Sequence, residues 1–292
     1  MSRPEAGGRS PRAPRPIIAA ASISSTVASF LRQPRRGTVL AVFARSCYLD
    51  LDESIVAVVA EELLNGPLNI VLPDPGRSFD QLVARGDVTA TPDALFVEGW
   101  PAISVREAVP WDPRIRPWSA GQMRGVVINL ETLSGRVMVD APAESLAQPR
   151  FEQVLAALRH ALRRRSPGEV ASAATGLAGL GGGLTPSGDD VLVGALVALA
   201  ALPGGRSDSL RSAIREGAAG RTTRISEAYL QAAARGEGSE AWQDLLLALA
   251  SATADDVIRT GRRVMAFGET SGADMLAGFL LAMPALMVAE LY

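Results

Sequence analysis

The sequence predicts an α+β protein in which a β-rich N-terminal half is followed by an all-helical C-terminal half. Short runs of β-branched and aromatic residues, separated by Pro and Gly turns, fill the first half. Alanine, leucine and arginine at helical spacing fill the second half. We place the change near Pro149 and expect a β-rich domain over residues 17–149 and a helical domain over residues 150–292. An Arg/Pro-rich stretch over residues 1–16 has the composition of a disordered tail.

The strands expected in the first half are short and closely spaced. They cover residues 38–43, 68–72, 94–99, 102–105, 125–130 and 135–140. Few helical crossovers separate them, which favours an antiparallel sheet or a small barrel over a parallel sheet. One helix is expected among them, over residues 53–64, where a helix-length run contains several β-branched residues.

The second half predicts seven helices, most of them bounded by Gly or Pro. They cover residues 150–165, 189–202, 207–219, 224–235, 241–250, 254–267 and 273–291. The two most apolar segments, 191–202 and 275–289, are shorter than the ~20 residues that a membrane span needs, and Pro284 interrupts the second. We therefore expect buried helices and no membrane contact.

The charged residues exclude several classes of protein. The formal net charge is −2, which gives no reason to expect a nucleic acid or an anionic membrane as partner. All 29 basic residues are arginine. Without lysine, this chain acting alone cannot form a Schiff base or supply the lysine of a Walker phosphate loop.

The chain has one cysteine, Cys47, and one histidine, His160. A disulfide framework and a Cys/His zinc cluster are therefore excluded within one chain. This content fits a reducing compartment, and we expect the protein in the cytoplasm. Cys47 is expected to be a buried small hydrophobe, and His160 a surface residue of an arginine-rich helix.

The helical half contains an internal repeat. S-G-D-D-V-L-V-G-A-L at residues 187–196 returns as S-G-A-D-M-L-A-G-F-L at residues 271–280. The repeat implies two equivalent helix starts, and the S-x-x-D spacing in each has the form of a capping box. Gly194 and Gly278 occupy the same position in the two copies, where a missing side chain lets helices cross closely. We expect the two helices to pack together with both starts at one end.

Helix capping does not account for every residue of the first copy. Asp189 has no acidic counterpart, because Ala273 stands at its position in the second copy, and Gly181, Gly182 and Gly183 have no equivalent either. A glycine-rich loop before a helix exposes N–H groups to an anion, and the helix dipole adds ~0.3 to 1 kcal/mol. Asp189 could then hold Mg²⁺ or orient a substrate amide.

A basic segment, G-R-T-T-R-I-S, contains two candidate anion-binding residues, Arg221 and Arg224. Guanidinium groups recognise carboxylate or phosphate in a bidentate manner. Thr222, Thr223 and Ser226 between and after them have the composition of a helix start. The alternative is a solvated helix end, since arginine is frequent throughout this chain.

Three motifs together resemble a known family. G-L-G-G-G-L-T-P-S-G-D-D-V-L-V-G, R-T-T-R-I-S and G-E-T-S-G-A-D-M-L-A-G occur in this order in a bacterial family that includes a subunit of the oxamate carbamoyltransferase of allantoin degradation. The resemblance is close in the helical half and general in the β-rich half, where it includes N-G-P at residues 65–67. It implies a subunit of an assembly that interconverts oxalurate and phosphate with oxamate and carbamoyl phosphate, working with two other protein chains.

The chemistry of this reaction allows site residues to be assigned on the three motifs. Asp189 and Asp190 would be catalytic, positioning the amino nucleophile or accepting its proton. The residues expected to bind a small anionic substrate provide N–H groups, hydroxyl groups and guanidinium groups: Gly181, Gly182, Gly183, Thr185, Ser187, Gly188, Arg221, Thr222, Arg224, Ser271, Gly272 and Asp274.

Two other functional classes remain open on the sequence. The chain could be a non-catalytic ligand-binding or scaffolding subunit whose chemistry occurs on another chain. It could also be a Mg²⁺-dependent phosphoryl-transfer enzyme that uses Asp189 and Asp190. No cofactor is required by the carbamoyl-transfer interpretation, and Mg²⁺ is the one that the acidic pair could hold.

Overall fold

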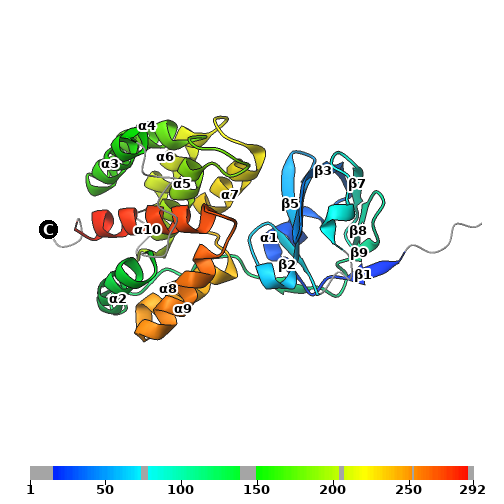
Figure 1. Cartoon of the computed structure of the whole chain (residues 1–292), viewed down its shortest axis with the longest axis horizontal. Helices are drawn as coiled ribbons and strands as arrows, with labels where there is room; N and C mark the ends of the chain where they lie inside the picture. Colours follow the sequence, from blue (N-terminus) through cyan, green and yellow to red (C-terminus); the bar gives the residue numbers. More distant parts are fainter. Residues whose placement is uncertain (1–15, 74–77, 139–148, 204–206, 252, 289–292) are drawn as a thin grey trace, which may run out of the picture.

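The protein divides into a half made of strands and a half made of helices, side by side along its longest axis (Figure 1). This computed structural model describes residues 16–73, 78–138, 149–203, 207–251 and 253–288. Residues 1–15, which carry most of the predicted disordered tail, lie outside the described residues. The predicted α+β class is confirmed.

The strands form one ten-stranded mixed sheet, in the order β1-β9-β8-β7-β3-β4-β5-β6-β2-β10. Three short helical turns, α1 (Ser25–Phe30), η1 (Glu61–Leu63) and η2 (Phe79–Gln81), lie between strands. The strands are β1 (Ile17–Ala19), β2 (Ser22–Ser24), β3 (Arg35–Phe43), β4 (Ser46–Leu51), β5 (Ser54–Ala60), β6 (Asn69–Leu72), β7 (Asp87–Ala90), β8 (Ala94–Val97), β9 (Ala102–Ser104) and β10 (Val109–Trp111).

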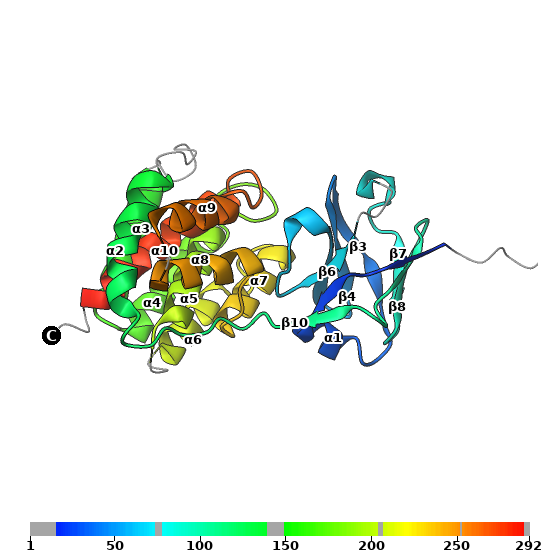
Figure 2. The same cartoon turned by 90° about the horizontal axis from the view of Figure 1, so that it is seen from below.

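The sheet is curled, and its two ends meet at one segment (Figure 2). β1 pairs with β9 at one end and β2 pairs with β6 and β10 at the other, yet only Ala20 and Ala21 separate β1 from β2. The Ala20 N–H donates to the Ser104 carbonyl at 2.8 Å, and the Ala21 N–H donates to that of Val71 at 2.9 Å. The sheet thus forms part of a barrel, close to the small barrel that was predicted. Three strand pairs are parallel, however, whereas antiparallel pairing was expected.

The helix predicted over residues 53–64 is wrong. This segment forms β5 and the turn η1, and β5 lies between β4 and β6. Its β-branched residues Ile55, Val56, Val58 and Val59 are all buried, as in a strand covered on both faces. Their preference for the pleated sheet outweighs the helical length of the run.

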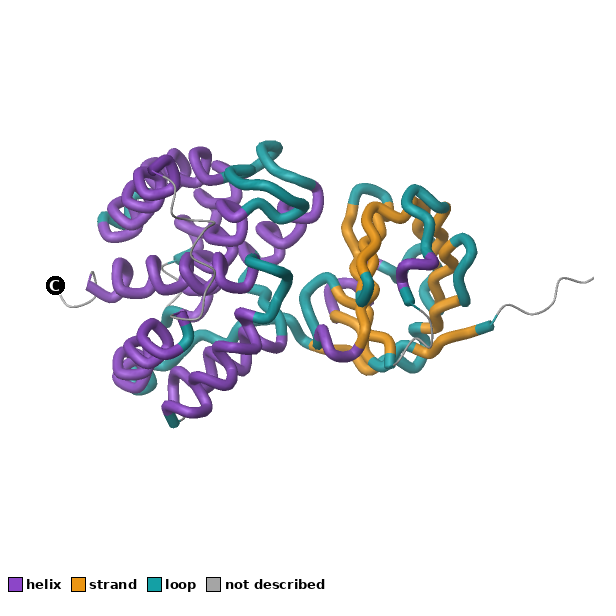
Figure 3. Tube along the Cα trace, in the orientation of Figure 1, coloured by secondary structure: helices purple, strands orange, loops and turns teal. Residues whose placement is uncertain are grey.

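The helical half contains nine described helices arranged around a buried central one, α5 (Figures 1 and 3). They are α2 (Met123–Arg136), α3 (Pro149–Arg163), α4 (Pro167–Leu177), α5 (Ser187–Ala201), α6 (Asp208–Ala218), α7 (Arg224–Ala234), α8 (Glu240–Ser251), α9 (Ala254–Met265) and α10 (Ser271–Val288). Seven of them correspond to the predicted helices, with ends shifted by a few residues. Helices α2 and α4 were not predicted.

Helix α2 replaces the strand predicted over residues 125–130, which is therefore wrong. Its buried residues, Val126, Leu130 and Leu133, recur at helical spacing, and the helix packs against α8 and α9. Residues 135 and 136 of the other predicted strand end the same helix, whereas residues 139 and 140 lie outside the described residues. The change from strands to helices therefore lies between β10 and α2. The domain boundary near Pro149 remains a prediction.

The two halves contact each other through β4, β5 and α7. The hydroxyl groups of Tyr48 and Tyr229 lie 3.1 Å apart, and a small apolar cluster that includes Ile225 and Leu68 surrounds them. The Thr26 hydroxyl group donates to a Glu237 carboxylate oxygen at 3.0 Å. The helical half is therefore held against one side of the curled sheet.

Cys47 is fully buried in β4, and burial raises the pKa of its thiol to about 12. Such a thiol is inert at neutral pH, as expected of a structural cysteine. His160 is exposed on α3, also as expected. Among the described helices, none combines the length and the apolar content that crossing a bilayer requires.

Candidate functional site

The starts of α5 and α10 lie beside each other, as the repeat predicts. The hydroxyl groups of Thr185 and Ser271 are 2.9 Å apart. Further along, an added Cβ on Gly194 would overlap the Met275 carbonyl group, and one on Gly278 would overlap a carbonyl of α5. The two helices therefore cross at the level of their backbones, and this crossing sets the distance between their starts.

Two other predicted site glycines serve helix packing. A Cβ on Gly188 would overlap the carbonyl at the end of α4, and one on Gly272 would overlap a carbonyl near the end of α9. Their N–H groups donate to the carbonyls of Leu180 and Phe267, both at 2.8 Å. Each helix start thus abuts the end of the preceding helix, and these two N–H groups are already used by the chain.

The capping box expected at Ser187 does not form. Ser187 is the first residue of α5, Pro186 holds the cap position, and no side chain caps the helix. The Pro186 carbonyl instead accepts the N–H groups of Asp189 and Asp190, at 2.9 and 3.2 Å. The N–H groups of Gly188, Asp189 and Asp190 are thus used by the chain itself and are not available to an anion.

Asp189 connects the glycine loop to the loop before α7. Its Oδ1 accepts the Gly179 N–H at 2.9 Å, and its Oδ2 accepts the Thr222 hydroxyl group. Asp189 is 1% exposed, and burial raises the pKa of its carboxyl, whereas the hydrogen bonds from Thr222 and Gly179 lower it. Since both carboxylate oxygens are engaged by the chain, Asp189 has a clear role in holding two loops together.

Asp190, the next residue in the chain, has a different environment from Asp189. It is 2% exposed, and its Oδ2 has no hydrogen-bond partner among the described residues. Burial raises the pKa of its carboxyl to about 8, and the neighbouring Asp274 and Asp189 add to this rise. The hydroxyl groups of Ser271 and Thr185 act in the opposite direction. Asp190 is thus a buried carboxyl that titrates near neutral pH, where a general acid or base is most useful.

The glycine loop itself is exposed on the end of the helical half that faces the sheet (Figures 1 and 3). Gly181 and Gly183 have φ angles of 118° and 84°, which favour glycine. The N–H groups of Gly181, Gly182 and Gly183 donate to no other described residue. A Cβ on Gly182 would meet nothing within 4 Å. The loop therefore presents three consecutive free N–H groups to solvent.

The loop before α7 lies against the glycine loop. The Thr223 hydroxyl group donates to the Leu184 carbonyl at 2.6 Å, and a Cβ on Gly179 would come within 2.5 Å of the Arg221 carbonyl. Arg221 is exposed, and its guanidinium group forms no ion pair or hydrogen bond within the described part of the chain. Arg224 instead pairs with Asp50 of β4 at 2.9 Å. Arg221 is thus the guanidinium group left available beside the loop.

Asp274 lies at the start of α10, is 2% exposed and influences the pKa of Asp190.

Tyr229 was missed by the sequence reasoning. Burial is the main cause that raises the pKa of the Tyr229 phenol, and the neighbouring Tyr48 and the charge of Asp190 raise it further. The phenol and the Asp190 carboxyl therefore lie near each other. No sequence signal marks Tyr229, because only the packing of α7 against α5 brings it to the site. The described residues contain no group of three or more His, Cys, Asp or Glu side chains arranged to bind a metal ion.

Comparisons with known proteins show a similarity in part of the helical half. No curated protein and no solved structure matches the chain significantly. Residues 177–283 match the family described as oxamate carbamoyltransferase subunit AllH. The matched segment begins at the last residue of α4 and includes the glycine loop, the loop before α7 and the starts of both repeated helices. The resemblance that the three motifs predicted is confirmed, and this segment of the chain is similar to the AllH subunit of oxamate carbamoyltransferase.

Proposed function

We propose that this protein is a subunit of an oxamate carbamoyltransferase-like complex and that its glycine loop, together with Arg221, binds a small anion. The observation that carries the proposal is the row of free N–H groups at Gly181, Gly182 and Gly183 beside a guanidinium group without a partner among the described residues. Carbamoyl phosphate, oxamate and oxalurate are anions of suitable chemistry. The family match over the same loops supports this assignment.

In carbamoyl transfer, the amide nitrogen of oxamate forms a bond to the carbamoyl carbon while the bond from that carbon to the phosphate oxygen breaks. The charge that develops on the carbamoyl and phosphate oxygens is stabilised by N–H groups and guanidinium groups. We assign these contacts to the glycine loop and Arg221. Thr185 and Ser271 would complete the polar surface between the two helix starts.

The attacking nitrogen must also lose a proton. In this proposal Asp190 accepts it, because its carboxyl has a pKa of about 8 and one oxygen without a partner among the described residues. Asp189 holds the glycine loop to Thr222 and so positions the anion site. The subunit is expected to need its partner chains for turnover, since the related family forms part of a multisubunit enzyme.

A binding experiment on the full chain tests the anion site. Isothermal titration with inorganic phosphate, carbamoyl phosphate and oxamate is expected to show binding that Gly182→Ala and Arg221→Ala both weaken. Gly182→Ala adds a methyl group where there is open space, so the fold is retained while the approach of an anion is hindered. Gly135→Ala and Arg215→Ala, both outside the site, are the matched controls.

The same titrations separate the other functional classes. Anion binding without turnover, followed by carbamoyl transfer when the partner chains are added, supports the proposal. If Gly182→Ala and Arg221→Ala bind anions as tightly as the unmodified chain, the glycine loop is not the site. Mg²⁺-dependent nucleotide binding that Asp189→Ala abolishes would instead favour phosphoryl transfer.

A further inference from the structure

The outer face of α2 carries apolar side chains that the described residues leave exposed. We define this face by the four residues Arg124, Val127, Ile128 and Glu131. Val127 is 48% exposed and Ile128 is 69% exposed, whereas the other side of the helix is buried against α8 and α9. A helix that is apolar on more than one side is normally covered on each of them.

The apolar surface continues from α2 onto α8. Leu247 of α8 is 65% exposed and lines the same hollow as Gln122, the residue that precedes α2. A Cβ on Gly125 would come within 2.6 Å of the Ala250 carbonyl, so the two helices touch here, and Leu247 lies within one turn of Ala250. Removing these side chains from water would be favourable, because burial of apolar surface drives association.

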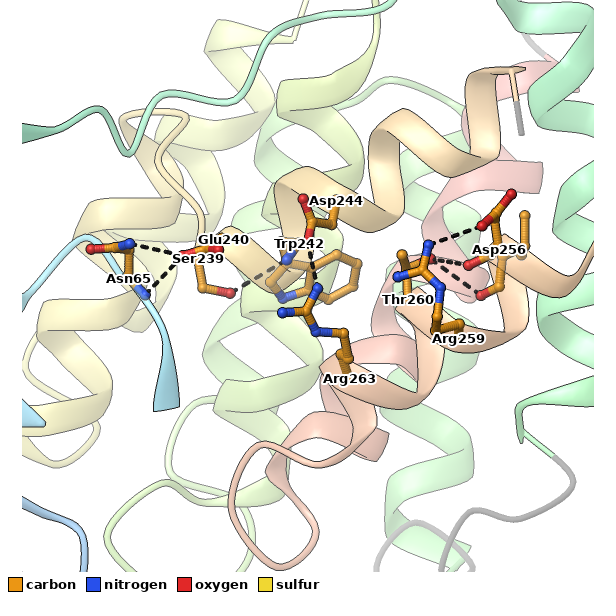
Figure 4. A network of polar contacts seen from close by, with 10 residues as sticks. Asn65, Ser239, Glu240, Trp242, Asp244, Asp256, Arg259, Thr260 and Arg263 are labelled. Carbon is orange, nitrogen blue, oxygen red and sulfur yellow. Dashed lines mark hydrogen bonds and ion pairs between the residues drawn. The ribbon is translucent and has the colours of Figure 1, made fainter. Parts of the chain in front are cut away.

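The outer face is presented by a helix that is packed in place. A Cβ on Gly261 of α9 would come within 2.7 Å of the Leu133 side chain, so α2 and α9 are also in close contact. Helices α8 and α9 are joined in turn by the ion pair between Asp244 and Arg263, with an N–O distance of 2.7 Å (Figure 4). The position of the outer face is therefore fixed by the two helices behind it.

Two oppositely charged side chains flank the apolar pair. The four residues of the outer face follow the spacing i, i+3, i+4, i+7, which places them on one side of a helix. The side chains of Arg124 and Glu131 are exposed, and neither forms an ion pair or hydrogen bond within the described part of the chain. They lie about 10 Å apart along the helix axis, taking a rise of about 1.5 Å per residue. Each is thus a charged group open to a second molecule.

The charges of the outer face are complementary to a second copy of the same face. The midpoint between Arg124 and Glu131 lies between Val127 and Ile128. If a second α2 lies antiparallel across a two-fold axis at this midpoint, each Arg124 faces Glu131 of the other copy, and the apolar pairs meet at the centre. A parallel arrangement would place like charges opposite each other, which is unfavourable. Two-fold contacts between identical patches are the commonest form of homo-oligomer.

We propose that the outer face of α2 is the two-fold contact between two copies of this chain, with the helices antiparallel, Val127 and Ile128 at the centre, and Arg124 of each copy paired with Glu131 of the other. Leu247 of α8 extends the apolar contact at its rim. Helix α2 lies on the outer side of the helical half, away from the β half that the glycine loop faces (Figures 1 and 2). The contact is therefore independent of the proposed anion site.

Sedimentation equilibrium of the full chain over roughly 1 to 300 μM is expected to show a reversible equilibrium between monomer and dimer. Arg124→Glu and Glu131→Arg each place like charges opposite each other and should weaken the dimer at least about tenfold. The double variant Arg124→Glu/Glu131→Arg exchanges the two charges and should restore the dimer. Arg159→Glu, which reverses the charge of an exposed arginine on α3, is the matched control and should leave the equilibrium unchanged.

A mixture of the two single variants gives the sharpest test. The outer face of Arg124→Glu carries two acidic groups and that of Glu131→Arg carries two basic groups, so only a mixed dimer brings opposite charges together at both pairs. Native mass spectrometry of the mixture should therefore find the mixed dimer in excess over the dimer of either variant alone. This outcome requires that the two faces meet each other, because a contact elsewhere on the chain would give no preference for the mixed dimer.

The apolar centre is tested by Ile128→Asp, which should abolish the dimer. Circular dichroism identifies a variant that fails to fold, and Ile128→Gln then replaces it. A monomer at every concentration, a dimer that both charge reversals leave intact, or no excess of the mixed dimer would each overturn the proposal. Arg124→Glu should leave the binding of inorganic phosphate unchanged, which separates this result from the test of the glycine loop.

Discussion

Gly194 of α5 and Gly278 of α10 each face the main chain of the other helix. A methyl group on Gly194 would overlap the Met275 carbonyl, and one on Gly278 would overlap the Val191 carbonyl. This reciprocal contact brings the two helix starts together, and the starts in turn place Asp190 beside Ser271. The geometry of the candidate site therefore depends on two positions well outside it.

The first prediction concerns this crossing. Gly194→Ala is expected to lower the free energy of unfolding by about 3 kcal/mol, because the helices must separate to admit the methyl group. Urea unfolding followed by circular dichroism measures the change. Gly135→Ala in α2, an exposed position where a Cβ meets nothing within 4 Å, is the control and should raise stability by about 0.5 to 1 kcal/mol. Equal effects of the two substitutions would contradict the crossing.

The second prediction concerns the connection between the two loops. Thr222→Val removes the hydroxyl group that donates to Asp189 and leaves a buried carboxylate oxygen without that donor. The expected loss of stability is about 1 to 3 kcal/mol. Thr222→Ser, which keeps the hydroxyl group, should restore most of it. In a double-mutant cycle with Asp189→Asn, the two substitutions should not be additive, and simple additivity would show that the contact contributes nothing.

The third prediction concerns pH. The pKa of Asp190 is raised from an ordinary value of 3.8 to about 8, so the folded protein binds a proton that the unfolded chain releases between these values. The contribution of Asp190 to stability is therefore fully present below about pH 4 and is lost as the pH rises towards 8. Asp190→Asn should remove this dependence, reducing the slope of stability against pH by up to about 1.4 kcal/mol per pH unit. Urea unfolding of both proteins between pH 5 and pH 8 measures it; parallel slopes would be inconsistent with a raised pKa.

The fourth prediction concerns the contact between the halves. Asn65→Ala removes the side-chain hydrogen bonds to Glu240 and Ser22 and is expected to cost about 1 to 3 kcal/mol. Arg224→Ala removes an ion pair with Asp50 that is partly exposed, and its effect is expected to stay below about 1 kcal/mol. Thermal unfolding compares the two. A larger loss from Arg224→Ala would show that the surface ion pair, and not the N-G-P segment, holds the halves together.

The helical half was the more predictable part of the fold. The similarity between residues 187–196 and 271–280 predicted two equivalent helix starts, and the structure places them side by side. Glycine at the same position in both copies predicted the close crossing, because no other residue permits backbone contact. The glycine positions were therefore predicted correctly, whereas the capping box expected at Ser187 did not form.

Segments with mixed preferences were not predicted correctly. Residues 125–130 contain Val126, Val127 and Ile128, which favour strands, yet packing of α2 against α8 and α9 decides their conformation. Residues 54–60 have the length of a short helix, but the two strands beside them supply partners for their backbone. Tertiary contacts made by distant parts of the chain overrule local preference in both cases.

The chemistry of the candidate site was only partly accessible from the sequence. The acidic pair and the glycine loop are visible as a motif, but the burial that distinguishes Asp190 from Asp189 arises from the meeting of α5 and α10. Arg221 and Arg224 look equivalent in the sequence. Asp50, from a strand far away in the chain, pairs with Arg224 and leaves Arg221 beside the loop.

The curled sheet has a consequence for how the chain folds. β1 and β2 precede all their partners in the sequence, and these partners extend to β10 at Val109–Trp111. The two ends of the curled sheet can therefore come together only after the intervening strands have paired, and contacts over long sequence separations form slowly. We therefore expect the two ends of the sheet to come together late in the folding of this half, and until then the first strands remain unpaired edges open to association with other chains.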